Sequence, residues 1–183
     1  TINPLPTATI TGTMTVCEGS TNTVSVPGAG VGASYNWSIS NGTINSMMPY
    51  GASISYTEGT SGAVTLNVTV TDAIGCSSTG NKSVTINPLP DQNITVATAV
   101  CSGSTMNMAS VPSAGMGATY VWGIDNGTIT SGQGTTDLQF TAGIYTGVPP
   151  DEVTLYVTIT DAAGCSNDNL QGVTINPLPG TTI

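Results

Sequence analysis

Apolar and polar side chains alternate along much of the chain. Every second residue from Val64 to Val70 is Val or Leu, and the segment from Val153 to Ile159 repeats the pattern. A period of two residues is typical of a strand with one buried and one solvated face. Helical periodicity is absent. Both segments are therefore expected to form long strands.

Shorter alternating segments surround these two and are bounded by Gly, Pro, Asn and Ser. The further expected strands are Thr9–Thr11, Thr13–Val16, Thr23–Val26, Tyr35–Ile39, Ser53–Tyr56, Ser83–Ile86, Asn93–Val96, Thr98–Val100, Met106–Val111, Tyr120–Ile124, Asp137–Phe140 and Gly172–Ile175. About seven short strands in roughly 85 residues predict an all-β sandwich. Tyr35 with Trp37, and Tyr120 with Trp122, share strand faces, so we expect these four side chains in the core.

The chain contains an internal repeat. The string Ile-Asn-Pro-Leu-Pro occurs at Ile2–Pro6, Ile86–Pro90 and Ile175–Pro179. Between these strings the two halves align, including their Cys, Trp and Asp-Ala-x-Gly-Cys positions. The predicted organisation is the end of a preceding repeat (1–6), two repeats (7–90 and 91–179) and the start of a further repeat (180–183). We interpret the chain as an excerpt of a longer tandem array; a two-domain protein with similar flanking strands is the alternative.

The segment Asn87, Pro88, Leu89 and Pro90 forms the predicted linker between the repeats. Each Pro fixes φ near −65° and favours an extended residue before it. The last strand of one repeat is thus expected to lead almost directly into the next, through a short, semi-rigid connection.

Composition excludes several functions. Charged residues are 6% of the chain, with one Lys or Arg, ten Asp or Glu, no His and a net charge of −9; about 25% is usual. Without His or Arg, most acid–base and phosphate chemistry lacks its usual residues. One Lys cannot hold a nucleic acid backbone, and no apolar run approaches the roughly 18 residues of a membrane span. We expect no enzyme, no nucleic acid partner and no membrane insertion.

The four cysteines occupy matching positions in the two repeats. Four Cys permit three pairings, and the repeat symmetry favours one disulfide in each repeat, Cys17–Cys76 and Cys101–Cys165. Disulfides indicate an oxidising, extracellular compartment. A zinc site is the alternative, but His and the Cys-x-x-Cys spacing are both missing.

The sequence resembles the PKD-like, immunoglobulin-like repeats of large secreted surface proteins of Bacteroidetes-type bacteria. The resemblance rests on Gly117-Ala-Thr-Tyr-Val-Trp122, on the stretch Asn126–Thr135 and on Val157–Cys165, with matching motifs in the first half except at Ser46–Tyr50. It implies two tandem β-sandwich domains, export to the cell surface, no catalytic residues, and a role as a stalk or adhesin repeat.

Three functional hypotheses follow. The first is an extracellular structural repeat of a rod-like stalk or filament, whose partners are further copies of the repeat in the same or neighbouring chains. The second is an adhesin module that binds glycan or protein through pole loops, chiefly Tyr145–Glu152, where the second repeat is longer. The third is a short subunit that polymerises by strand addition.

Metal and cofactor sites have little support. Calcium binding is conceivable at Asp161 with Asp168, or at Asp151 with Glu152, but calcium takes six to eight oxygen ligands. The first repeat lacks the acidic and amide residues that surround Asp168. Asp72 and Asp161 fit better as turn residues that accept backbone hydrogen bonds. No cofactor is expected.

Overall fold

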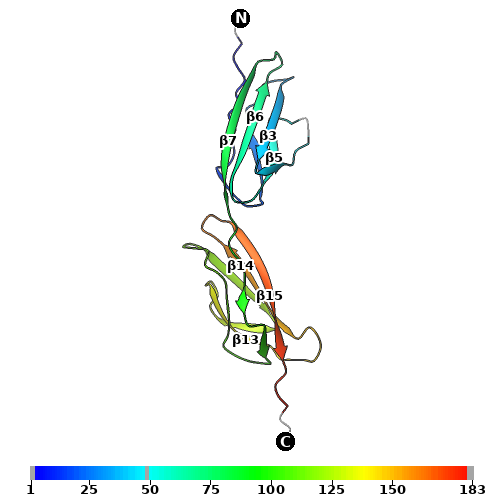
Figure 1. Ribbon diagram of the computed structural model, residues 1–183, viewed down its shortest axis with the longest axis vertical. Coiled ribbons are helices and arrows are strands. Elements are labelled where there is room, and N and C mark those ends of the chain that lie inside the picture. The colour runs from blue at the N-terminus through cyan, green and yellow to red at the C-terminus, as the bar shows by residue number, and fades with distance from the viewer. Residues whose placement is uncertain (1–2, 48–49, 181–183) are drawn as a thin grey trace. The chain divides into compact units, whose positions relative to one another are not determined.

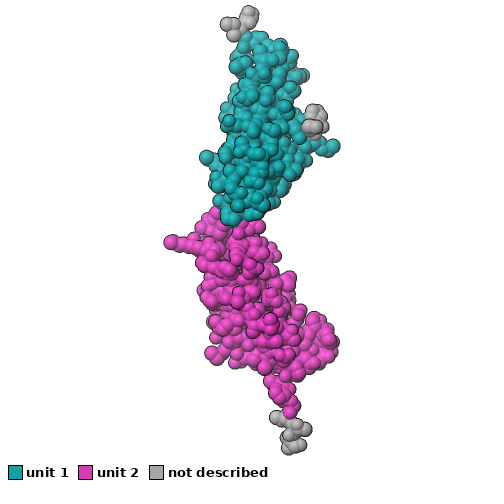
Figure 2. Space-filling view, in the orientation of Figure 1, with its two compact units in different colours: residues 1–88 teal, residues 89–183 magenta. Residues whose placement is uncertain are grey.

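The structure is a computed structural model that describes residues 3–47 and 50–180. Two residues of the expected leading segment (1–2) and three of the expected further repeat (181–183) lie outside the described residues. The chain divides into two compact units, residues 1–88 and 89–183 (Figures 1 and 2). Every named element is a β-strand.

The first unit consists of two sheets. A four-stranded sheet has the order β1-β7-β6-β3, and a three-stranded sheet has the order β2-β5-β4. The strands are β1 (Thr15–Cys17), β2 (Thr21–Ser25), β3 (Ser34–Ser40), β4 (Gly42–Ile44), β5 (Ser53–Glu58), β6 (Gly62–Thr71) and β7 (Ser77–Asn87). One face of each sheet contributes to a common core, so the unit is a β-sandwich.

The second unit repeats this architecture. Its sheets have the orders β11-β14-β15-β9 and β12-β13-β10-β8. The strands are β8 (Thr95–Val96), β9 (Ala99–Cys101), β10 (Asn107–Ser110), β11 (Thr119–Asp125), β12 (Gly127–Ser131), β13 (Asp137–Ala142), β14 (Glu152–Thr160) and β15 (Ser166–Asn176). The core again lies between the two sheets.

The alternation along the long strands explains both cores. Val64, Leu66, Val68 and Val70 on β6 are at most 2% exposed, and the polar residues that alternate with them are at least partly exposed. On β14 the same pattern buries Val153, Leu155, Val157 and Ile159. Burying a Val or Leu side chain contributes about 1.5–3 kcal/mol, so these strands supply much of the stability of each unit.

Several strand predictions were wrong in extent. β7 and β15 begin six residues before the expected Ser83 and Gly172, since they pair antiparallel with the whole of β6 and β14. β4 and β12 were not expected. Each follows an Asn, Asn41 or Asn126, with φ of 55° or 53°, which turns the chain sharply into the second sheet. The expected strand Thr9–Thr11 is only an isolated bridge from Thr11 to Ser25.

The expected disulfide within each repeat is also wrong. Cys17 and Cys165 are disulfide-bonded, whereas Cys76 and Cys101 carry free thiols. The reason lies within each unit: Cys17 is in register with Asn87, the last residue of β7, and Cys76 directly precedes the first. Eleven strand residues span about 36 Å, and a disulfide needs Cα atoms within about 7 Å.

Candidate functional site

The two ends of each unit carry the candidate functional features. One end holds the hairpin between the two longest strands, with a cysteine at its base. The opposite end holds a short parallel strand pair and the other cysteine. The long strand, β7 or β15, runs from the first end to the second (Figure 1).

An aspartate organises each hairpin. The Asp72 Oδ1 atom accepts hydrogen bonds from the backbone N–H groups of Ile74 (3.1 Å) and Cys76 (2.8 Å). Asp161 Oδ1 accepts the equivalent bonds from Ala163 and Cys165, both at 2.9 Å. The carboxylate therefore satisfies two backbone donors of a tight turn and holds the following cysteine in place.

At the opposite end, the first and last strands of each unit pair in parallel. In the first unit β1 pairs with the end of β7, with Thr15, Val16 and Cys17 in register with Thr85, Ile86 and Asn87. Two further bonds bracket this ladder: Thr85 N–H donates to Met14 O and Glu18 N–H donates to Asn87 O, both at 2.9 Å. We call this segment, residues 14–18 with 85–87, the parallel clamp of the first repeat.

The second unit contains the same clamp. Ala99, Val100 and Cys101 of β9 are in register with Thr174, Ile175 and Asn176 of β15. The bracketing bonds are Thr174 N–H to Thr98 O (3.1 Å) and Ser102 N–H to Asn176 O (2.9 Å). Sequence reasoning missed both clamps. The one available signal was the Cys-x-Gly-Ser turn that follows each short strand.

The segment that precedes each clamp lies along the beginning of the long strand. Ser78 Oγ donates to Pro6 O, and Ala8 O lies so close to Gly80 that a Cβ there would be 1.8 Å away. In the second unit Asn167 Nδ2 donates to Pro90 O (3.1 Å) and Asn169 Nδ2 donates to Gln92 O (3.1 Å). The chain thus enters each unit at the hairpin end and leaves it at the clamp end.

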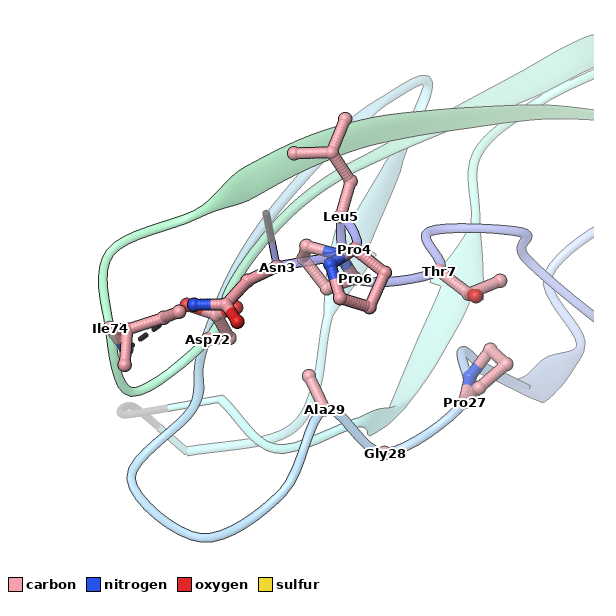
Figure 3. Close-up of a pocket in the computed structure, with 10 residues that line it drawn as sticks. All are labelled: Asn3, Pro4, Leu5, Pro6, Thr7, Pro27, Gly28, Ala29, Asp72 and Ile74. Carbon is pink, nitrogen blue, oxygen red and sulfur yellow. Dashed lines mark hydrogen bonds between the residues drawn. The ribbon is translucent and has the colours of Figure 1, made fainter. Parts of the chain in front are cut away.

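A shallow pocket lies at the hairpin end of the first unit (Figure 3). Its lining residues are Asn3, Pro4, Leu5, Pro6, Thr7, Pro27, Gly28, Ala29, Asp72 and Ile74. Leu5 and Ile74 are more than half exposed. The lining mixes proline rings and aliphatic groups with polar groups, among them the Asp72 carboxylate, which already accepts two backbone hydrogen bonds.

The aromatic residues chosen from the sequence lie in or against the two cores. Trp37 and Trp122 are each 3% exposed, and their Nε1–H groups donate to Gly51 O (3.0 Å) and Thr135 O (2.9 Å). Tyr120 is buried and Tyr35 is partly buried. Their hydroxyls accept hydrogen bonds from the N–H groups of Ala114 and Ala29. These side chains are thus engaged in packing.

The weak calcium candidates are not brought together. Asp161 caps its hairpin, and Asp168 lies on β15 between Asn167 and Asn169, which hold the entering segment. Asp151 Oδ1 accepts bonds from the N–H and Oγ1–H of Thr146, both at 2.8 Å. Glu152 belongs to β14. Among residues 3–47 and 50–180, no group of three His, Cys, Asp or Glu side chains could hold a metal ion.

The loop between β13 and β14 is the largest difference between the units. It exposes three apolar side chains, Ile144, Tyr145 and Val148. The bonds from Thr146 to Asp151 close its second half, and the Tyr145 N–H donates to Ser102 Oγ (2.9 Å). The loop is therefore tied to the turn that follows β9.

Two tyrosines have shifted pKa values. Burial, and after it the charge of Glu58, raises the pKa of Tyr56 above 10.0. A hydrogen bond to Asp125 is the main cause of the raised pKa of Tyr156, which lies on the outer face of β14. Glu58 is 5% exposed and accepts bonds from Ser20 Oγ (3.0 Å) and Asn22 Nδ2 (2.6 Å).

These features define a class of protein: two tandem β-sandwich modules, each entered and left at opposite ends. The chain belongs to the family of PKD-like domains, whose model matches residues 3–86 and again residues 87–175. Such domains are typically not catalytic. In the described part of the chain, no helix is long and apolar enough to cross a membrane.

The chain also shows limited similarity to several solved structures. The insect immune protein hemolin is 11% identical, over 92% of this chain and 46% of its own, with a TM-score of 0.45. The adhesin InvE of Yersinia pseudotuberculosis is 12% identical, over 92% and 58%, with a TM-score of 0.36. The human desmocollin-1 ectodomain is 11% identical, over 100% and 39%, with a TM-score of 0.34. The chain thus spans about half of these proteins. No curated protein sequence matches it.

Proposed function

We propose that the protein is a tension-bearing structural repeat of an extracellular stalk or filament. The observation that carries the proposal is the parallel clamp at the end of each unit where the chain leaves. The disulfide-bonded state of Cys17 and Cys165 supports an oxidising compartment outside the cell. The near absence of positive charge supports a spacer rather than a binder of nucleic acid or phosphate.

The direction of load explains why a parallel pair resists extension. Tension pulls the residues before β1 toward the hairpin end, and the residues after β7 toward the clamp end. The two strands are therefore loaded in opposite directions along their axes, so the hydrogen bonds of the clamp must break together. Forced unfolding is governed by the unfolding rate rather than by equilibrium stability, so the clamp sets the resistance of each repeat.

The proposal is tested by removing one clamp bond without disturbing the backbone. Glu18 occupies the second position of a turn closed by Ser20 N–H to Cys17 O (3.1 Å), with Gly19 at φ 72°. Proline is favoured at this position of such a turn. Glu18→Pro thus deletes the N–H that donates to Asn87 O and keeps the turn.

Glu18→Ala is the matched control, because it removes the same side chain but keeps the N–H. The chain is stretched by its two ends in reducing buffer, by single-molecule force spectroscopy. Loss of one net hydrogen bond, about 1 kcal/mol, should raise the forced unfolding rate of the first repeat about fivefold. The second repeat serves as the internal reference. Equal unfolding forces for the two variants would overturn the proposal.

A second function, binding through the loop between β13 and β14, is favoured by one observation. Ile144, Tyr145 and Val148 present apolar side chains on a loop that is held by hydrogen bonds within the loop and to the turn after β9. The double variant Ile144→Asn with Val148→Asn should lose binding to a panel of immobilised glycans and surface proteins, with unchanged thermal stability. If the native chain binds nothing in the panel, or the variant binds equally, the loop is not an adhesive site.

A further inference from the structure

The outer face of the sheet β11-β14-β15, on the side away from the core of the second unit, has an unusual centre. The strand registers arrange its outward residues in three rows of three. Tyr156 is the central residue, between Gly123 and Leu170. The row on one side of it consists of Asp125, Thr154 and Gly172, and the row on the other side consists of Val121, Thr158 and Asp168. We call these nine residues the outer array of the second repeat.

The ring of Tyr156 lies against β11. A Cβ at Gly123 would be 3.6 Å from the Cβ and Cδ2 atoms of Tyr156, so the glycine leaves room for the ring. The Tyr156 hydroxyl donates a hydrogen bond to Asp125, two residues further along the same strand. The residue is nevertheless 37% exposed, and Val121 and Leu170 beside it are 63% and 62% exposed. The centre of the array is therefore an apolar surface open to solvent.

Three carboxylates surround this apolar centre. Asp125 and Asp168 are at opposite corners of the array, each about 7–8 Å from the central residue. A Cβ at Gly172, a third corner, would be 2.8 Å from Glu152 Oε2, so the Glu152 carboxylate lies over that corner. The charges of Asp125 and Glu152 both contribute to the raised pKa of Tyr156. The second unit contains no Lys or Arg that could neutralise these charges.

The equivalent array in the first unit is polar and uncharged. The registers of β3, β6 and β7 place Asn67 at its centre, between Ser38 and Asn81. The other six positions are Asn36, Ser40, Thr65, Thr69, Thr79 and Ser83. Because this polar array belongs to a sandwich of the same topology, the fold does not require the apolar and acidic side chains of the second array.

We propose that the outer array of the second repeat binds an arginine-bearing segment of a different protein. A guanidinium group can stack on the exposed ring of Tyr156, while the aliphatic part of the same side chain packs on Leu170. The surrounding carboxylates can accept paired hydrogen bonds from its planar N–H groups, which a lysine cannot provide in that geometry. A second copy of this chain is not the partner, because the chain has no Arg and Lys82 is its one basic residue. The proposal does not rest on the tension-bearing role proposed above.

The test is an NMR titration of the ¹⁵N-labelled full chain with a short peptide in which arginine and threonine alternate. NaCl at about 0.15 M screens charges more than about 8 Å apart, so general attraction to the acidic chain is reduced. The backbone signals of Gly123, Tyr156 and Leu170 should shift, and those of the equivalent row in the first repeat should not. The same peptide with citrulline, an uncharged isostere, in place of arginine should shift neither set.

Two variants separate the ring from the charges. Tyr156→Asn, the residue at the equivalent position of the first repeat, should weaken binding about two- to fivefold, although the net charge is unchanged. Asp168→Asn should weaken binding by up to about fivefold. The matched control Asp137→Asn removes the same charge from β13, in the other sheet, and should leave binding unchanged. The amide spectrum of each variant shows directly whether it is folded.

Several results would overturn the proposal. The arginine peptide shifts no signal of the outer array, or the citrulline peptide binds as well. Tyr156→Asn binds as tightly as the native chain, or Asp137→Asn weakens binding as much as Asp168→Asn. Shifts of the same signals by neutral oligosaccharides alone would assign the face to a glycan instead. None of these results bears on the parallel clamp, which the force measurements test separately.

Discussion

Asp161 shows at the scale of one residue how a hairpin end is built. Its carboxylate accepts the N–H groups of Ala163 and Cys165, each at 2.9 Å, and neither N–H has a neighbouring strand to pair with. Because the Asp-Ala-x-Gly-Cys motif occurs in both repeats, this turn could be predicted from the sequence. The Asp favours the turn, and Gly164, at φ 85°, permits the left-handed residue that completes it.

We predict that Asp161→Ala lowers the free energy of unfolding of the second repeat by about 1–3 kcal/mol, because two donors lose their acceptor. Asp161→Asn, which keeps an acceptor oxygen at the same place, should recover most of the loss. Hydrogen-exchange mass spectrometry of the second-repeat peptides measures both effects. Equal losses for Ala and Asn would mean that the charge, rather than the acceptor, matters.

Tyr56 is a second informative residue. Its ring is fully buried, and its hydroxyl has no hydrogen-bond partner among the described residues. The aligned residue in the second repeat is Phe140, also fully buried. Tyr56→Phe should therefore raise the free energy of unfolding of the first repeat by about 1 kcal/mol. The reciprocal change, Phe140→Tyr, should lower that of the second. Denaturant-dependent hydrogen exchange resolves the two repeats, and a loss with Tyr56→Phe would refute the argument.

The raised pKa of Tyr56 predicts how the stability of the first repeat changes at alkaline pH. Burial raises the pKa of Tyr56 in the folded state above the 10.0 of an ordinary tyrosine. Above pH 10 the unfolded chain therefore releases this proton before the folded chain does, and stability falls as the pH rises toward the folded-state pKa. Stability of the first repeat should fall between pH 9.5 and about pH 11, and less steeply in Tyr56→Phe. Identical pH profiles would contradict this cause.

At the scale of the element, the long strand β7 shows where hydrophobic pattern stops being informative. Its second half alternates, and Val84 and Ile86 are buried. Its first six residues, 77–82, contain no large apolar residue and were not predicted as strand. They form a strand because the antiparallel register with β6 continues to the hairpin, where Thr71 pairs with Ser77. The first half of β7 is therefore a strand because of its pairing with β6, and the hydrophobic pattern of the sequence carries no signal of that pairing.

Gly80, in this polar half of β7, permits the close approach of the entering segment. A Cβ at this position would lie 1.8 Å from the carbonyl oxygen of Ala8. We predict that Gly80→Ala displaces residues 7–10 from β7, at a cost of about 1–3 kcal/mol, seen as faster hydrogen exchange in that segment. The control Gly28→Ala, where a Cβ would meet nothing within 4 Å, should leave exchange unchanged. Unchanged exchange in Gly80→Ala would contradict the predicted clash.

At the scale of the whole molecule, the internal sequence repeat was the main basis for predicting the domain organisation. The repeated Ile-Asn-Pro-Leu-Pro strings and the matched Cys, Trp and Asp positions were enough to predict two tandem all-β domains. They were not enough to pair the cysteines. Repeat symmetry shows that equivalent residues have equivalent environments, but it does not show whether the two cysteines of one repeat lie close enough to bond. The register of β1 with the end of β7 shows that Cys17 and Cys76 do not.

The parallel clamp could not be predicted from the sequence either. Three-residue strands such as β1 and β9 are too short to show a period, and parallel pairing with the last strand is a property of the closed sandwich. Because of the clamp, the force that a repeat resists should depend on the direction in which the repeat is pulled. The same bonds should resist load along the strands and yield to load across them.

The most direct test of the proposed function therefore changes only the direction of pulling. In one version of the chain, handles are attached at Thr7 and Leu89, so that tension loads β1 and β7 in opposite directions along their length. In the other, handles at Glu18 and Leu89 pull the adjacent ends of the two strands apart, and the bonds open one at a time. Both are stretched in reducing buffer with the same force spectrometer. The account predicts a clearly higher unfolding force for the first pair of handles, and equal forces would contradict it.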